Sequence, residues 1–121
     1  MERPIAGDIE AGDAWEVKVS KSRYKNYWYG IVLKMIKQYP EIRQGTSMQE
    51  YIFTRAIEKA LEDTGAIKET GQLRVQAVRW IYFEDSKSVD GAADRCNVSR
   101  GTMLRWLQAF VRQVARNAGY M

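Results

Sequence analysis

The stretch from Val89 to Gln108, VDGAADRCNVSRGTMLRWLQ, decides the fold. Its first part predicts a short amphipathic helix over Val89–Cys96, and its second part predicts another helix that starts at Ser99. Asn97 lies between them, where the chain must reverse, and Asn tolerates the left-handed backbone conformation better than most residues that carry a side chain. Two helices joined by so tight a turn indicate a helix-turn-helix.

The residue types around the turn fit this interpretation. Ala92 and Ala93 are small, so two helices can cross closely there, and Val98 is placed to fill the space between them. Ser99 is a favourable N-cap, because its hydroxyl accepts a hydrogen bond from a free amide of the next turn. In a DNA-binding motif of this kind the second helix enters the major groove at its N-terminal end. The alternative interpretation is two packed helices of a small bundle.

The second helix is predicted to continue from Ser99 to about Ala118, where Gly119 ends it. At about 100° per residue its apolar residues gather on one side. They are Met103, Leu107, Phe110, Val111, Val114 and Ala118. Three arginines gather on the opposite side, and the chain from Arg95 onward holds five arginines and no acidic residue. The positive charge is therefore concentrated on the outer face of this helix.

This charge and the helix tip predict the DNA-binding residues. They are Ser99, Arg100, Thr102, Arg105, Gln108, Arg112 and Arg116. Arg100 lies at the tip, where a guanidinium group can bond guanine with two hydrogen bonds. Arg112 and Arg116 lie farther along and are expected to meet phosphates. Trp106 lies between the two faces and is expected to pack in the core.

The composition agrees with a nucleic-acid partner and disfavours catalysis. The 121 residues fit one domain, and a net charge of +4 with a pI of about 9.3 is compatible with binding DNA. With no histidine and one cysteine, the chain offers no zinc cluster and no histidine-based catalytic dyad. A glycine-rich phosphate loop is also absent from the sequence. We therefore expect no enzyme, no cofactor and no metal.

The single thiol also indicates a location. Cys96 cannot form an intrachain disulfide, which suits a reducing cytoplasm, and it is expected to be a small core residue. No apolar run approaches the roughly 20 residues of a membrane helix, and the N-terminus does not resemble a signal peptide. We expect a cytoplasmic protein without a membrane partner.

The rest of the chain divides into three parts. Residues 1–19 are expected to form a flexible N-terminal segment, residues 20–70 an N-terminal helical part, and residues 71–121 the helix-turn-helix part. The expected class is therefore all-α, with a bundle of four to five helices. The wide aromatic face of residues 24–39 is a candidate surface for a homodimer, and the basic residues of residues 18–37 are either a solvated helix face or auxiliary phosphate contacts.

Three further helices precede the motif in this prediction. The first covers Ser20–Tyr39 and is stopped by Pro40, with a loop to Thr46. The second begins with a capping box in which Ser47 is the cap and Glu50 stands three residues later. It ends at Gly65, a natural C-cap. The third covers residues 72–83 and is expected to brace the motif.

A resemblance adds to this interpretation. Residues 72–118 resemble the C-terminal helix-turn-helix of sigma-factor region-4-like regulators, on the stretch AVRWIYFEDSKSVDGAADRCNVSRGTMLRWLQAFVRQVA. Small phage and prophage transcription regulators of the RinA and ArpU type are similar in length and in this C-terminal motif. The resemblance implies control of phage late genes by binding near a promoter and contacting RNA polymerase.

The expected function is sequence-specific binding of double-stranded DNA by a transcription regulator. Two alternatives stay open. One is a small terminase subunit, a DNA-packaging protein that forms rings. The other is a helical protein-interaction module whose basic helix binds an acidic protein and has no affinity for DNA.

Overall fold

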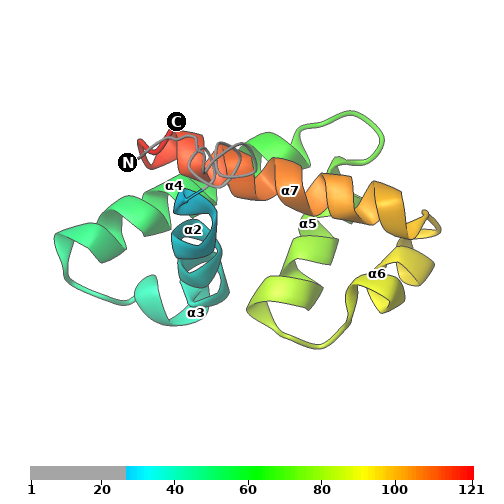
Figure 1. Ribbon diagram of the computed structural model, residues 1–121, viewed down its shortest axis with the longest axis horizontal. Coiled ribbons are helices and arrows are strands. Elements are labelled where there is room, and N and C mark those ends of the chain that lie inside the picture. Colours follow the sequence, from blue (N-terminus) through cyan, green and yellow to red (C-terminus); the bar gives the residue numbers. More distant parts are fainter. Residues whose placement is uncertain (1–26) are drawn as a thin grey trace, which may run out of the picture. The chain divides into compact units, whose positions relative to one another are not determined.

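The computed structural model of the chain describes residues 27–121 (Figure 1). Every regular element in this range is helical, so the predicted all-α class is confirmed for it. The elements are α2 (Trp28–Lys37), α3 (Tyr39–Ile42), α4 (Met48–Gly65), α5 (Gly71–Val78), the π-helical turn η1 (Arg79–Phe83), α6 (Val89–Cys96) and α7 (Arg100–Asn117). The expectations for residues 1–19, and for the start of the helix predicted from Ser20, lie outside the described residues.

The chain divides into two compact units, Met1–Ile31 and Val32–Met121, and α2 crosses the boundary between them. In the described part of the first unit, Trp28 is buried and its ring centroid lies 5.8 Å from that of Tyr29. All later elements belong to the second unit, which contains the predicted motif.

The region around Pro40 differs from the prediction. The helix predicted to reach Tyr39 ends at Lys37, and α3 follows after one residue, where a loop was expected from Glu41. Pro40 lies in the first turn of α3. A proline is tolerated there because the amides of the first helical turn have no partner within the helix. Pro40 therefore begins a new helix rather than a loop.

The start of α4 is confirmed, and its end is not. The backbone amide of Glu50 donates to Ser47 Oγ at 3.1 Å, and the amide of Ser47 donates to Glu50 Oε1 at 3.1 Å, which completes the capping box. Gly65 was expected to be the C-cap, but it is the last helical residue, and Ala66 caps the helix with φ −81°. The left-handed conformation comes later, at Glu69, with φ 73°.

The third predicted helix begins at Gly71 and changes geometry before it ends. Its first part is α-helical, and its last five residues form η1. Gly71 is buried against the end of α4, where a Cβ atom would lie 2.5 Å from the carbonyl oxygen of Gly65 and 2.7 Å from that of Thr64. This close approach requires glycine.

The core of the second unit forms where α7 packs against α4. The buried residues of α7 are Met103, Trp106, Leu107, Phe110, Val111, Val114 and Ala115. The buried residues of α4 are Phe53, Ala56, Ile57, Ala60 and Thr64. Five of the six residues predicted for the apolar face of α7 are buried, and Trp106 is in the core as expected. Ala118 is half-buried because it follows the last helical residue and caps the helix.

Candidate nucleic-acid interface

The α6 and α7 helices are joined by a short turn whose residues have the predicted roles. Ser88 caps α6 by accepting from the amide of Gly91 at 3.0 Å. Asn97 ends α6 in the left-handed conformation, with φ 59° and ψ 44°. Ser99 then caps α7 by accepting from the amide of Thr102 at 3.1 Å. Local hydrogen bonds therefore set where both helices begin.

The α5 helix braces this pair, since it contacts both α6 and α7. Ala92, Ala93 and Cys96 form the buried face of α6. The Sγ of Cys96 lies 3.9 Å from the carbonyl oxygen of Leu73 on α5. Burial raises the pKa of the Cys96 thiol, while the nearby Arg95 opposes that shift. The thiol is therefore held as a neutral core group, as the sequence predicts.

Three contacts between a basic side chain and an aromatic ring lie in the same region. The guanidinium carbon of Arg74, on α5, lies 5.1 Å from the ring centroid of Trp106, on α7. Trp80, in η1, is contacted by Lys87 Nζ at 5.2 Å and by the guanidinium of Arg95 at 5.7 Å. Such cation–π contacts contribute on the order of 0.5–1 kcal/mol each at partly exposed sites. These contacts link α5 to α7 and η1 to α6.

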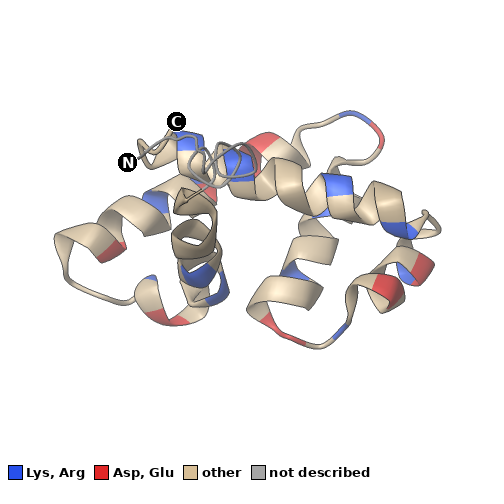
Figure 2. Ribbon diagram, viewed as in Figure 1, with Lys and Arg blue, Asp and Glu red and all other residues tan. Residues whose placement is uncertain are grey.

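The predicted DNA-binding residues lie on the surface of this scaffold. Six of the seven are exposed, and Thr102 is half-buried. Figure 2 shows the basic positions spread along α7, which carries four arginines and no acidic residue. The side of α7 opposite to its core face therefore presents cationic side chains to solvent.

At the N-terminal tip of α7, three side chains form a small hydrogen-bonded group. Ser99 Oγ donates to Thr102 Oγ1 at 3.1 Å, and Nη2 of Arg105 donates to the same Thr102 oxygen at 3.1 Å. The hydrogen bond to Thr102 therefore holds the guanidinium group of Arg105 close to the N-terminal turn of α7. Hydrogen bonds among Ser99, Thr102 and Arg105 therefore hold the side chains at the tip in place.

Arg100 has a partner that sequence analysis missed. Its Nη1 donates to Oδ1 of Asp90 at 2.6 Å, which joins the first turn of α7 to the first turn of α6. Both side chains are largely exposed, at 59% and 69%. Asp90 is the acidic residue in the first turn of α6, which was a weak indication of this pair, but only the packing of the two helices brings Asp90 to Arg100.

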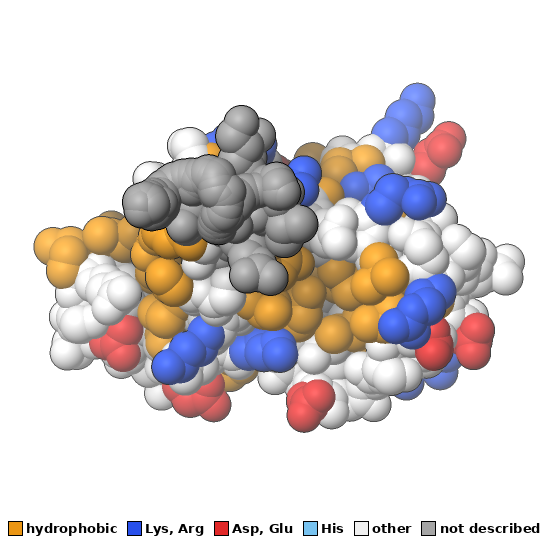
Figure 3. Space-filling model, viewed as in Figure 1, with side chains coloured by type: hydrophobic (Ala, Val, Ile, Leu, Met, Phe, Trp, Pro, Cys, Tyr) orange, Lys and Arg blue, Asp and Glu red, His pale blue; other side chains and the backbone are white. Residues whose placement is uncertain are grey.

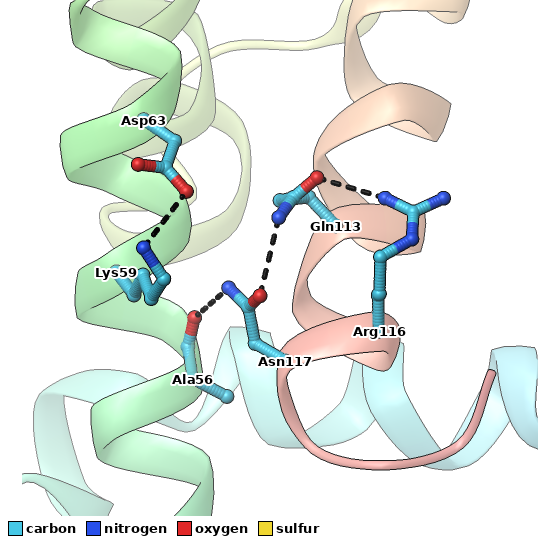
Figure 4. A network of polar contacts seen from close by, with 6 residues as sticks. All are labelled: Ala56, Lys59, Asp63, Gln113, Arg116 and Asn117. Carbon is cyan, nitrogen blue, oxygen red and sulfur yellow. Dashed lines mark hydrogen bonds and ion pairs between the residues drawn. The ribbon is translucent and has the colours of Figure 1, made fainter.

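The C-terminal end of α7 carries a polar network that sequence analysis also missed (Figure 4). Arg116 Nη1 donates to Gln113 Oε1 at 2.9 Å, and Gln113 Nε2 donates to Asn117 Oδ1 at 3.1 Å. Asn117 Nδ2 donates to the carbonyl oxygen of Ala56, on α4, at 3.1 Å. Spacings of three and four residues made the first two contacts foreseeable, but the link to Ala56 depends on packing. The network orients Arg116 relative to α4.

A shallow hollow of about 520 Å³ follows the cationic face of α7. Its lining residues are Arg105, Gln108, Ala109, Arg112, Gln113 and Arg116. Within residues 27–121, Arg112 makes no ion pair or hydrogen bond with another side chain. The space-filling view shows basic side chains projecting from the surface of the second unit (Figure 3). This face thus offers both free and preoriented guanidinium groups.

Across residues 27–121, no group of three or more acidic or cysteine side chains is arranged to bind a metal ion. None of the described helices combines the length and apolarity needed to cross a bilayer. No protein-family model, no curated protein and no solved structure matches the chain.

Proposed function

We propose that the protein binds double-stranded DNA, with α6 and α7 acting as a helix-turn-helix and α7 as the helix that enters the major groove. One observation carries the proposal. The α7 helix buries one side against α4, and its opposite side, which holds arginines and no acidic residue, is exposed to solvent. The N-terminal tip of α7 is exposed as well. This is the arrangement that groove binding requires, because the tip must approach base edges while the rest of the helix follows the backbone.

The arginines along α7 match phosphate contact. Arg105 and Arg116 are 11 residues apart, which corresponds to a rise of about 17 Å along the helix. Guanidinium groups over this length can neutralise several phosphates and release their counterions. Arg112 can do so without giving up a contact to another described side chain. Arg116 is held by Gln113, so it loses less freedom on binding.

The tip of α7 provides the candidate groups for reading bases. Arg100 can bond guanine, and the hydroxyl of Ser99 or Thr102 can add weaker base or phosphate contacts. Gln108 lies farther along the same exposed side and offers an amide that suits adenine. Sequence preference is therefore assigned to the tip, and general affinity to the arginines beyond it.

The regulatory part of the proposal is more specific. A cytoplasmic transcription regulator of phage late genes, acting near a promoter with RNA polymerase, is the role that the RinA and ArpU resemblance supports. The α7 face supplies the DNA contact in that role.

Selection of bound fragments from phage and bacterial genomic DNA tests the proposal. Fluorescence anisotropy on the selected duplex, at several salt concentrations, then measures affinity. Replacing Arg105, Arg112 and Arg116 together with Gln should weaken binding more than a hundredfold at moderate salt, since three phosphate contacts are lost. The matched control replaces Arg43, Lys68 and Arg79 with Gln, which removes the same charge outside α6 and α7 and should change affinity far less.

The same measurements separate the alternatives. Absence of affinity for any duplex at moderate salt would contradict DNA binding and favour a protein-interaction module. A ring-shaped oligomer that binds DNA would favour a small terminase subunit. Equal losses in the two triple variants would show that binding depends on net charge and not on the face of α7.

A further inference from the structure

The outer face of α4 is unusual for a helix exposed to water. Tyr51 and Ile52 are exposed apolar residues in its first half, with 57% and 43% of their surface accessible. Arg55, Glu58, Lys59 and Glu62 follow on the same face. At about 100° per residue all six lie within roughly 120° of the helix circumference. Figure 3 shows hydrophobic side chains exposed over the start of α4.

This face is also hollowed. A groove of about 670 Å³ runs along it between α4 and the end of α7. Its lining residues are Tyr51, Ile52, Arg55, Ala56, Glu58, Lys59, Glu62 and Asn117. The groove therefore combines two exposed apolar side chains with a row of charged ones. The groove adjoins the C-terminal end of α7 at Asn117, whereas the tip of α7 at Ser99 lies about 27 Å away along the helix.

The charges on this face identify the partner. Basic and acidic residues alternate along the groove, so a polyanion or a partner of one charge sign would meet like charges as well as opposite ones. A second copy of the same helix, running antiparallel, meets the opposite charge instead. With a two-fold axis between Glu58 and Lys59, Arg55 of each copy faces Glu62 of the other. Such an interface is self-complementary.

We propose that the α4 face is a homodimer interface, in which two α4 helices pair antiparallel across their grooves. Tyr51 of one copy then lies beside Ala66 and the exposed Ile67 of the other, which buries apolar surface at both ends of the pairing. The Arg55–Glu62 pairs fix the register. The ion pair of Lys59 with Asp63, 3.4 Å within one chain, is exposed and leaves Lys59 free to adjust.

The proposal places the dimer contact on α4 and not on residues 24–39. It does not rest on DNA binding. If the protein does bind DNA, the same pairing gives each dimer two groove-reading helices on one duplex, as in other two-fold DNA-binding proteins.

Sedimentation of the free protein over a wide concentration range tests the pairing. The native chain should reach a dimer mass. Arg55→Glu should weaken association about tenfold or more, because two attractive pairs become repulsive, and Glu62→Arg should do the same. Lys37→Glu makes the same charge change on α2 and serves as the control, with association unchanged.

Charge exchange makes the test independent of folding defects. A mixture of the Arg55→Glu and Glu62→Arg chains should form a heterodimer, and the double variant should again form a homodimer. A native chain that stays monomeric, or single variants that dimerise like the native chain, would overturn the proposal. Failure of both the mixture and the double variant to recover would overturn it as well.

A separate readout distinguishes this inference from the proposed function. Anisotropy with the selected duplex measures DNA binding, and sedimentation without DNA measures pairing. A protein that dimerises through α4 and ignores DNA would remove the proposed function and leave the interface standing. A protein that binds DNA as a monomer would remove the proposed α4 interface and leave the proposed DNA-binding function standing.

Discussion

Nη1 of Arg100 lies 2.6 Å from Oδ1 of Asp90, so the first residue of α7 is tied to the first turn of α6. The contact holds the candidate base-reading guanidinium beside a carboxylate when DNA is absent. An exposed pair of this kind contributes on the order of 0–1 kcal/mol to stability. Its larger effect is expected on binding, because a guanidinium that bonds guanine must leave the carboxylate or share it.

Asp90→Asn is expected to strengthen DNA binding severalfold, because it removes a negative charge near the duplex and frees Arg100. The free energy of unfolding should fall by about 1 kcal/mol or less, since Asp90 also favours the start of α6. Anisotropy and chemical denaturation measure the two quantities. Asp94→Asn removes an exposed charge from the same helix and is the control. Weaker binding of Asp90→Asn than of the control would contradict this role.

Arg100→Ala and Arg112→Ala should differ in kind. Loss of Arg100 should relax sequence preference by about 1–3 kcal/mol at one base position, because a two-bond contact to a base edge is lost. Loss of Arg112 should weaken binding to all sequences and reduce the salt slope by about one. Competition between selected and mutated duplexes at several salt concentrations measures both effects. If neither variant changes binding, α7 is not the groove helix.

Gly71→Ala should destabilise the fold, because its Cβ would collide with the carbonyl oxygens of Thr64 and Gly65. We expect a loss of more than 2 kcal/mol in the free energy of unfolding, as for other backbone and overpacking clashes. Gly30→Ala is the matched control, because no atom lies within 4 Å of its Cβ position and it is inside α2. That change should stabilise the chain by about 0.5–1 kcal/mol. Equal effects would contradict the close packing at Gly71.

Tyr39 should give the protein an alkaline limit to its stability. Burial, followed by the hydrogen bond that its hydroxyl donates to Glu58 at 3.0 Å, raises the pKa of Tyr39 above its ordinary 10.0. The folded state then keeps the phenolic proton at a pH where the unfolded state releases it. This stabilisation is complete below pH 10 and is lost as the pH rises through the folded pKa.

Chemical denaturation across alkaline pH tests this dependence on Tyr39. Tyr39→Phe should be less stable than the native chain below pH 10, and the difference should shrink as the pH rises above it. A difference that stays constant with pH would show that the hydroxyl is not coupled to folding.

The fold was most predictable where local chemistry sets it. Ser47 and Ser99 each cap a helix as expected, because a cap depends on residues within three positions. Asn97 takes the left-handed turn for the same reason. The buried face of α7 followed from the 3.6-residue period, which depends only on one helix being amphipathic.

The errors come from contacts between distant residues or from mild local preferences. Gly65 suits a C-cap, yet it is the last residue of α4 and Ala66 caps the helix, while the backbone of Gly71 packs close to the carbonyl group of Gly65. Pro40 can end one helix or start another, and the sequence pattern does not separate these choices.

The candidate site shows the same limit. The exposed positions of Arg105 and Arg112 followed from helical periodicity. The pairing of Arg100 with Asp90 did not, because it depends on the angle at which α6 meets α7. The link from Asn117 to Ala56 spans 61 residues of sequence, and no local rule predicts it.

The wide turn of η1 bears on how the chain tolerates a change of length. Elsewhere in a helix, removing one residue rotates everything after it by about 100°. A π-helical turn already holds one surplus residue, so deletion of a residue from Arg79–Phe83 can be absorbed by tightening to α geometry. We expect α6 and α7 to keep their orientation after such a deletion. We therefore expect natural variants to differ in length at η1, just before α6 and α7, without a change in the orientation of these two helices.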